Sequence, residues 1–201
     1  MLTTPAVVAW RRTFRAIALR PVIGVAVFCV VPTAWTLLRH GHDLRYAWVA
    51  AVVVGGAGLA FAVDDDAAVL LAASPSPLFI RRAARVFAAA VPVVAAWLVI
   101  IELSAATNRL DGAPVGLLGV EALTAAGVAL AVAGTGRRAG NVGTGVSGFF
   151  AGILTMAFVS AMSVQYPWLP RVGEAAHHER WLWIAAAAWA AALWSARDES
   201  R

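Results

Sequence analysis

The chain has 201 residues, of which 61% are hydrophobic and 13% are charged, with a mean hydropathy of +0.77. A soluble domain has about 45–50% apolar and about 25% charged residues, so this chain has too little polar surface to cover its core in water and lipid must cover it. The net charge of +5 comes from short clusters of arginine between apolar runs. That placement excludes the basic face of a nucleic-acid-binding protein and predicts charge at membrane surfaces.

Six apolar runs of about membrane length follow one another along the chain. A span needs about 20 apolar residues, with a range of about 17–25. The first run begins with Pro21 and is expected to be a retained helix, because no small-residue cleavage site of a signal peptide follows it. The sixth run is short, but Trp181 and Trp194 flank it and suit the membrane interface. The sequence predicts an all-α, polytopic membrane domain over residues 1–201, with spans at 21–38, 46–63, 86–105, 115–136, 142–164 and 181–195.

Arginine placement predicts the orientation of these spans. With the N-terminus in the cytoplasm, eleven arginines fall in the cytoplasmic loops and termini and five fall on the opposite side. Cytoplasmic loops of membrane proteins carry an excess of Lys and Arg. Both termini are therefore expected on the cytoplasmic side.

Residues 4–19 precede the first span and have the pattern of an amphipathic interfacial helix. Thr4 can cap this helix and Pro5 suits its first position. Apolar residues recur at helical spacing while the arginines point elsewhere, as in helices that lie on anionic headgroups. The alternative is a simple basic flank to the first span. The apolar stripe is Val7, Trp10, Phe14 and Ile17, and the arginines are Arg11, Arg12 and Arg15.

Residues 64–85 join the second span to the third and contain clear stop and start signals. Three aspartates can cap a short helix, because negative charge is favourable at a helix N-terminus. Two Ser-Pro pairs at 74–77 then stop that helix and begin another, which continues into the third span. The functional interpretation is a cytoplasmic coupling helix that receives force from a partner; the alternative is a structured loop whose charges only fix topology. The expected coupling residues are Asp64, Asp65, Asp66, Val69, Leu70, Leu71, Arg81, Arg82 and Arg85.

Acidic residues inside the spans are the candidates for a pathway. Glu102 and Glu121 both lie toward the outer ends of adjacent spans. Carboxylates within a membrane are costly and commonly contact a cation or a substrate. Glu102 is within a turn of its boundary and could instead reach the interface, whereas proton coupling through Glu121 would indicate a secondary transporter. No metal site is predicted, since Asp64–Asp66 lack a second acidic cluster facing them.

The sequence Gly-Val-Ser-Gly at 145–148, followed by Gly152, resembles the nucleophile motif of rhomboid intramembrane proteases. That family also has six spans and pairs its serine with a histidine in a later span. Here Ser147 lies near the inner end of the fifth span, whereas His177 and His178 lie in the outer loop, roughly 28 Å away at 1.5 Å per residue. A serine nucleophile needs its base within about 3 Å. Small residues at this spacing also indicate close helix packing, and no catalytic residue is predicted.

The whole layout resembles the membrane subunit of an ABC exporter of the ABC-2 type. Such subunits have an N-terminal interfacial helix, six spans, a coupling helix between spans two and three, and an outer re-entrant segment before span six. The counterparts are residues 4–19, the six spans, residues 64–85 and residues 165–180. The stretches VDDDAAVLLAASPSPLFIRRAARV, YPWLPRVGEAAHHERW and WSARDES also look like those of small permease-like proteins from GC-rich bacteria.

The resemblance implies a transport role without chemistry on this chain. The sequence lacks a GxxxxGK[ST] phosphate loop, so ATP and Mg are expected on a separate ATP-binding cassette subunit. Two permease chains, identical or related, would join two ATPase chains in the cytoplasmic membrane of a bacterium. The apolar spans are compatible with lipids, peptides or amphipathic drugs as substrates. The alternative is a membrane scaffold or accessory subunit that does not itself transport.

Overall fold

The computed structural model describes residues 19–38, 44–63, 78–106, 115–172 and 178–196. Within these ranges the protein is helical and contains no strand, which confirms the predicted all-α fold with six helices. The helices are α2 (Leu19–Leu38), α3 (Leu44–Ala57) with the 3₁₀ helix η1 (Gly58–Val63) that continues it, α4 (Leu78–Ala106), α5 (Val115–Arg138), α6 (Thr144–Gln165) and α7 (His178–Ser195).

One predicted span changes helix type along its length. The helix α4 begins at Leu78, directly after the Ser-Pro pairs predicted to begin it, and passes through the basic stretch into the third apolar run. The predicted second span is α-helical only as far as Ala57 and then tightens into η1. A Cβ added to Gly58 would lie 2.7 Å from Val25 Cγ1, so the backbone of η1 lies close against α2 and a larger residue there would displace the Val25 side chain.

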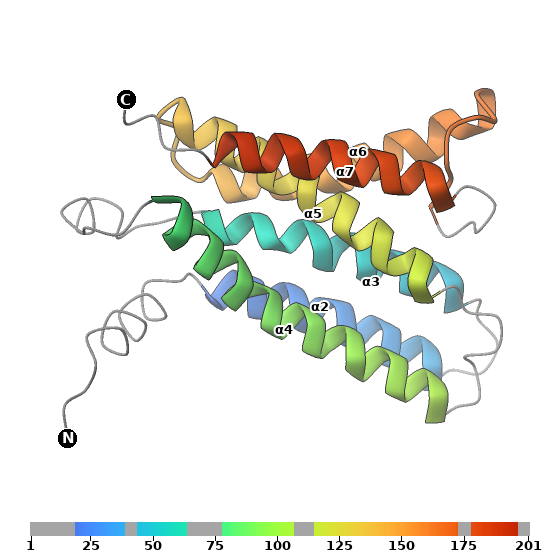
Figure 1. The fold of residues 1–201 in the computed structure, drawn as a ribbon. Coiled ribbons are helices and arrows are strands. Elements are labelled where there is room, and N and C mark those ends of the chain that lie inside the picture. Colours follow the sequence, from blue (N-terminus) through green and yellow to red (C-terminus); the bar gives the residue numbers. More distant parts are fainter. Residues whose placement is uncertain (1–18, 39–43, 64–77, 107–114, 173–177, 197–201) are drawn as a thin grey trace, which may run out of the picture.

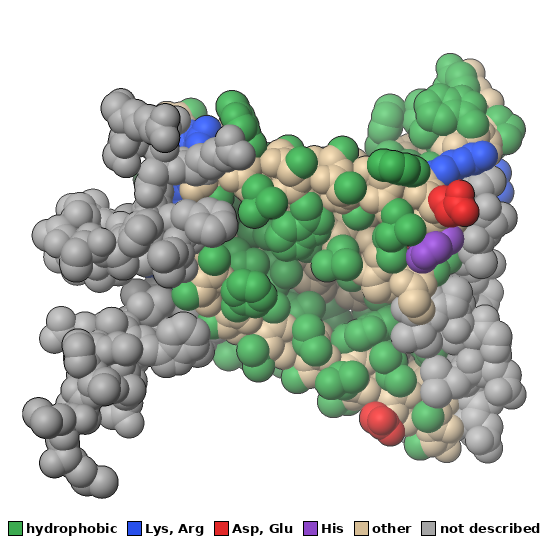
Figure 2. Space-filling model, viewed as in Figure 1, with side chains coloured by type: hydrophobic (Ala, Val, Ile, Leu, Met, Phe, Trp, Pro, Cys, Tyr) green, Lys and Arg blue, Asp and Glu red, His purple; other side chains and the backbone are tan. Residues whose placement is uncertain are grey.

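The outward surface of the bundle is apolar. Three stretches, Arg82–Ala106, Gly116–Arg138 and Thr144–Gln165, are long and apolar enough to cross a membrane, and Arg20–Thr36 and Trp48–Val63 are shorter apolar helices. Large apolar side chains point away from the core, among them Phe28, Phe87 and Phe158. Figure 2 shows hydrophobic side chains over the middle of the visible face. A soluble monomer rarely exposes apolar patches of this extent, so the surface favours a membrane protein.

The helices form two groups with α3 between them. The helix α5 packs against α3, α6 and α7, whereas α2 packs against α3 and α4. The helices run alternately up and down the bundle (Figure 1). The starts of α2, α4 and α6 and the ends of η1, α5 and α7 lie together at what we call the Arg82 end. The opposite helix ends meet at the Trp168 end.

Small residues allow the closest helix contacts. A Cβ on Gly148 would lie 2.8 Å from Ala133 Cβ on α5, and a Cβ on Gly152 would lie 3.0 Å from Ala57 Cβ. These approaches confirm close packing as the interpretation of the glycines at 145–152. Ser147 does not contribute to them, because its side chain is exposed.

Candidate functional site

A cleft lies between α4 and α5. In the described part of the chain, α4 packs on α2, α3 and η1 but makes almost no contact with α5. The space left between them is a cavity of about 480 Å³, which lies within the usual size range of ligand pockets. Its walls include Trp97 on α4 and Leu123 on α5, and α3 supplies Gly55 at its base. Figure 2 shows the surface hollowed between the α4 side and the α5–α7 side of the bundle.

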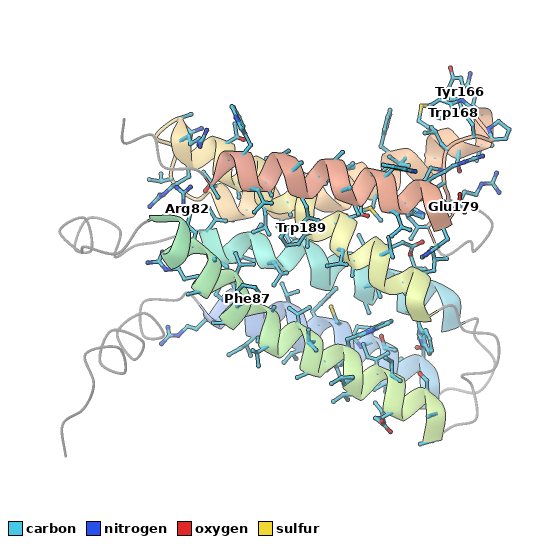
Figure 3. All side chains as sticks on the ribbon, viewed as in Figure 1. Arg82, Phe87, Tyr166, Trp168, Glu179 and Trp189 are labelled. Atoms are coloured by element: carbon cyan, nitrogen blue, oxygen red, sulfur yellow. The ribbon has the colours of Figure 1, made fainter. Side chains whose placement is uncertain are left out.

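A second cavity, of about 350 Å³, lies nearer the Arg82 end. On α4 the larger cavity is lined by residues between 90 and 100 and the second by residues between 82 and 87. On α5, residues 116–126 line the larger cavity and residues 130–134 line the second. The two cavities therefore lie one after the other along α4 and α5. Phe87 and Trp189 line the second cavity from α4 and α7 (Figure 3). We call the two cavities together the α4–α5 cleft.

Two arginines hold the last turn of α7 at the Arg82 end. Arg82 Nη1 donates a hydrogen bond to the Ser195 carbonyl at 3.2 Å, and Arg138 Nη2 donates one to the Trp194 carbonyl at 2.8 Å. The Arg138 guanidinium also lies 5.0 Å from the centroid of the Trp194 ring. Cations that bond the last carbonyls of a helix interact favourably with its dipole. The end of α7 is thus fixed to α4 and α5 by charge-assisted contacts.

The predicted coupling residues divide into those that the structure places and those that it does not describe. Arg82 lies at the mouth of the second cavity, whereas Arg85 is buried, with 4% of its surface exposed. The Arg85 side chain therefore lies in the interior, and its predicted coupling role stays a prediction. The backbone of Arg81 belongs to α4, but its side chain is outside the description. The remaining residues, which also lie outside the described ranges, are Asp64, Asp65, Asp66, Val69, Leu70 and Leu71. The interfacial helix expected at residues 4–19 lies outside them too, except for its last residue, Leu19, which begins α2.

The two candidate pathway acids are not brought together. Glu121 is fully buried and shares a face of α5 with Leu117 and Ala125, which pack in the cluster around Trp181. That face is turned toward α6 and α7 and does not line the cleft. Glu102 is exposed near the end of α4. The arrangement offers no paired carboxylates among the described residues.

A return segment, residues 166–172, follows α6 at the Trp168 end. The Val172 backbone N–H donates to Ser160 Oγ at 3.1 Å, and Arg171 Nε donates to Ser163 Oγ at 3.0 Å. The chain therefore turns back beside the last turns of α6. Trp181 Nε1 joins α7 to this segment by donating to the Arg171 carbonyl at 3.2 Å. Tyr166 and Trp168 form the exposed tip (Figure 3).

Sequence reasoning missed both the cleft and the serines that hold the return segment. The small residues of α5 at 116, 119, 122 and 126 were visible as a stripe, but such a stripe indicates close packing as readily as an open space. Ser160 and Ser163, one turn apart before a loop with prolines and Arg171, were a usable signal. Serine hydroxyls near a helix end commonly bond backbone or charged groups of the following loop.

No hydrolytic or metal site is found in the part of the chain that the structure describes. Ser147 lies in the first turn of α6 at the Arg82 end, and His178 begins α7 at the opposite end. A serine–histidine pair of the rhomboid type is therefore absent among the described residues; His177 lies outside them. Within the same residues, no group of three or more His, Cys, Asp or Glu could hold a metal ion.

No protein-family model, curated protein or solved structure matches this chain. Its function is accordingly inferred from the chain's own geometry.

Proposed function

We propose that this chain is the transmembrane subunit of an ATP-driven exporter in a bacterial cytoplasmic membrane. It crosses the membrane six times, with both termini and the Arg82 end in the cytoplasm. A separate ATP-binding cassette subunit carries ATP and Mg, and two permease chains form the working unit. The observation that carries the proposal is the course of α4, one helix from Leu78 to Ala106 that forms a wall of the α4–α5 cleft.

The course of α4 provides a mechanical link between the coupling segment and the cleft. The second part of the expected coupling segment, residues 64–85, belongs to this helix, which begins at Leu78. A packed helix moves as a stiff element, so force applied before Leu78 displaces the cleft wall that contains Ala90, Val93 and Trp97. The scarcity of contacts between α4 and α5 leaves room for this motion. ATP-driven displacement would thereby widen or close the cleft.

Charge and helix length support the proposed topology. Glu102, Glu121 and Glu179, the carboxylates whose side chains are described, all lie in the half of the bundle toward the Trp168 end. An excess of arginine at one end is the pattern of a cytoplasmic face. At 1.5 Å per residue, the 18 residues of α7 extend about 27 Å, close to the hydrocarbon thickness of about 30 Å. The arginine side chains described at the Arg82 end are Arg20, Arg82, Arg85, Arg137 and Arg138.

The return segment supports the resemblance at the outer face. Its hydrogen bonds to Ser160 and Ser163 bring the chain back along α6, as expected of a short re-entrant segment before the last span. Tyr166 and Trp168 at its tip suit the membrane–water interface.

Copurification with an ATPase tests the proposal. A tagged chain should bring down an ATP-hydrolysing subunit from its own cells, and Leu70→Asp with Leu71→Asp should abolish that binding and the associated ATP turnover. The reason is that the substitutions put charge on the apolar face expected in the partner's cleft. Trp168→Asp, an equally drastic change at the opposite end, should leave both unchanged. A stable complex that lacks any ATPase would contradict the exporter and favour a scaffold or accessory subunit.

A further inference from the structure

We propose that the larger cavity between α4 and α5 holds one acyl chain of a phospholipid from the leaflet on the Trp168 side of the membrane. The chain enters sideways between the two helices, with its methyl end toward the middle of the bundle. The site rests on the membrane location proposed above but requires no ATPase partner. Three features of the cavity carry it: its apolar lining, its opening toward the membrane, and its depth.

The lining favours a hydrocarbon occupant. Among the residues that line the larger cavity, only Cys29 and Trp97 have a side chain with a polar atom. The Cys29 thiol is already bonded to the Ala51 carbonyl, at 3.3 Å. An ordered water needs 2–4 polar partners, so water does not fill a space of about 480 Å³ with this lining. A hydrocarbon chain needs no polar partner, and it supplies the dispersion contacts that an empty space would forfeit.

The cavity opens onto the surface that faces lipid. Val94 on α4 and Leu123 on α5 both line it and are 52% and 53% exposed, so they form the two sides of its mouth. Val91 and Leu98, which flank Val94 along α4, are exposed as well. The cavity is therefore continuous with the apolar outer surface of the bundle (Figure 2). Lipid chains, which are as apolar as these side chains, cover that surface in a membrane and can enter from it.

The depth of the cavity matches one leaflet of a bilayer. On α5 the lining begins at Gly116, in the first turn at the Trp168 end, and ends at Ala126. This stretch rises about 15 Å, half of the hydrocarbon thickness of about 30 Å. At its inner end, Ala89, Ala126 and Leu130 are buried in one packed cluster, which closes the cavity toward the Arg82 end. A chain that enters from the Trp168 side therefore ends near the middle of the membrane.

The glycines of α5 show that the protein does not fill this space with its own atoms. A Cβ on Gly116 or on Gly119 would meet no atom within 4 Å, although both glycines line the cavity. A Cβ on Gly127, on another face of the same helix, would lie 3.0 Å from Ala188 Cβ on α7. The glycine at 127 thus allows a close helix contact, whereas those at 116 and 119 leave room for a chain.

Glycine positions also provide a matched pair of variants. Gly119→Phe places a ring in the larger cavity, where a Cβ meets no protein atom. An added Cβ at Gly24 also meets nothing, but Gly24 lies on the exposed surface of α2 outside the cavity. Gly24→Phe therefore adds the same ring at an ordinary surface position. Leu123→Trp, at the exposed rim, is a second cavity variant, which narrows the mouth without entering the packed core.

Photocrosslinking of the full chain in nanodiscs tests the site. Two phosphatidylcholine probes carry a diazirine on one acyl chain, near the methyl end in the first and near the ester in the second. Mass spectrometry locates the crosslinks. The methyl-end probe should label the inner part of the cavity, at residues 90–93 and 122–126, and the ester-end probe the outer part, at residues 97–100 and 116–119. Labelling of Ala126, which is buried, separates a chain in the cavity from one on the outer surface.

The variants test whether the cavity itself is the site. Gly119→Phe should abolish labelling of Ala126 by the methyl-end probe, because the ring occupies the space of the chain. Leu123→Trp should lower this labelling, and Gly24→Phe should leave it unchanged. Because the nanodiscs contain no ATPase, failure to copurify an ATPase leaves these results intact.

Three results would overturn the lipid site: no labelling of Ala126, unchanged labelling in both cavity variants, or a reversed order in which the ester-end probe labels the inner part. A second copy of the chain is the competing occupant. Disulfide formation between chains through Gly119→Cys in a Cys29→Ala background would show that a copy covers the cavity and would refute the lipid.

Discussion

Single glycines determine whether two helices touch or leave space in this bundle. At Gly148 and Gly152 a side chain would enter the surface of α5, whereas at Gly24 and Gly119 it would meet nothing. Close approach of backbones is a main source of helix association in membranes, because apolar burial alone does not favour protein over lipid. The stability of the bundle should therefore depend on particular glycines and be insensitive to others.

Gly148→Val should destabilise the bundle. Its side chain would collide with Ala133 and Ala60, and overpacking of this kind costs about 1–3 kcal/mol. Thermal unfolding in detergent, followed by circular dichroism, measures the effect. Gly24→Val is the control and should unfold at nearly the parent temperature. Equal melting temperatures for the two variants would refute the role assigned to Gly148.

At the scale of elements, the return segment connects α6 to α7. Residues 171 and 172 are bonded to α6 through Ser160 and Ser163, and Trp181 fixes the start of α7 to the same segment. Trp181 is itself fully buried in the cluster around Met156. The segment therefore determines how the first turn of α7 docks on the bundle.

Ser160→Ala should loosen the return segment without unfolding the helices. The substitution removes the acceptor of the Val172 N–H, and a hydrogen bond contributes about 0.5–1.5 kcal/mol, so exchange of amides in 166–172 should rise about fivefold. Hydrogen–deuterium exchange with mass spectrometry measures it. Ser147→Ala, exposed at the other end of α6, should exchange like the parent. Unchanged protection in Ser160→Ala would mean that the hydroxyl does not hold the segment.

At the scale of the whole molecule, the α2–α4 pair and the α5–α6–α7 group face each other across the cleft, with α3 between them. The alternating course of the helices brings the arginine-rich helix ends together. This arrangement makes the topology directly testable at exposed loop positions that the structure describes.

Cysteine labelling in intact cells tests the topology. In a Cys29→Ala background, Pro167→Cys at the Trp168 end should react with an impermeant thiol reagent. The reason is that Pro167 is exposed and that this end is expected outside the cell. Asn141→Cys, in the turn between α5 and α6, should react only after the cells are opened. Positions 42, 111 and 175 should behave like 167, and positions 75 and 139 like 141. Labelling of Asn141→Cys in intact cells would reverse the orientation.

The sequence by itself determined the helices and most of their limits. Apolar runs, the prolines before Leu78 and the glycines after Arg138 act locally, and in lipid a backbone without helical hydrogen bonds is too costly to span the membrane. The placement of Arg82 at one end and Trp168 at the other followed from the same pattern. The sequence did not determine which neighbouring helix packs against each face of a given helix.

Only the tertiary structure decided which face of α5 is packed and which is open. Glu121 is turned toward α6 and α7, while Gly119, two residues earlier, lines the cleft. Gly56 and Gly119 are the same residue type in apolar helices, yet the first abuts the Ala122 backbone and the second has no neighbour. The physical reason is that each contact depends on a helix from a distant part of the chain. Helix formation depends on residues close in the sequence, whereas contact or separation between two helices depends on residues far apart in it.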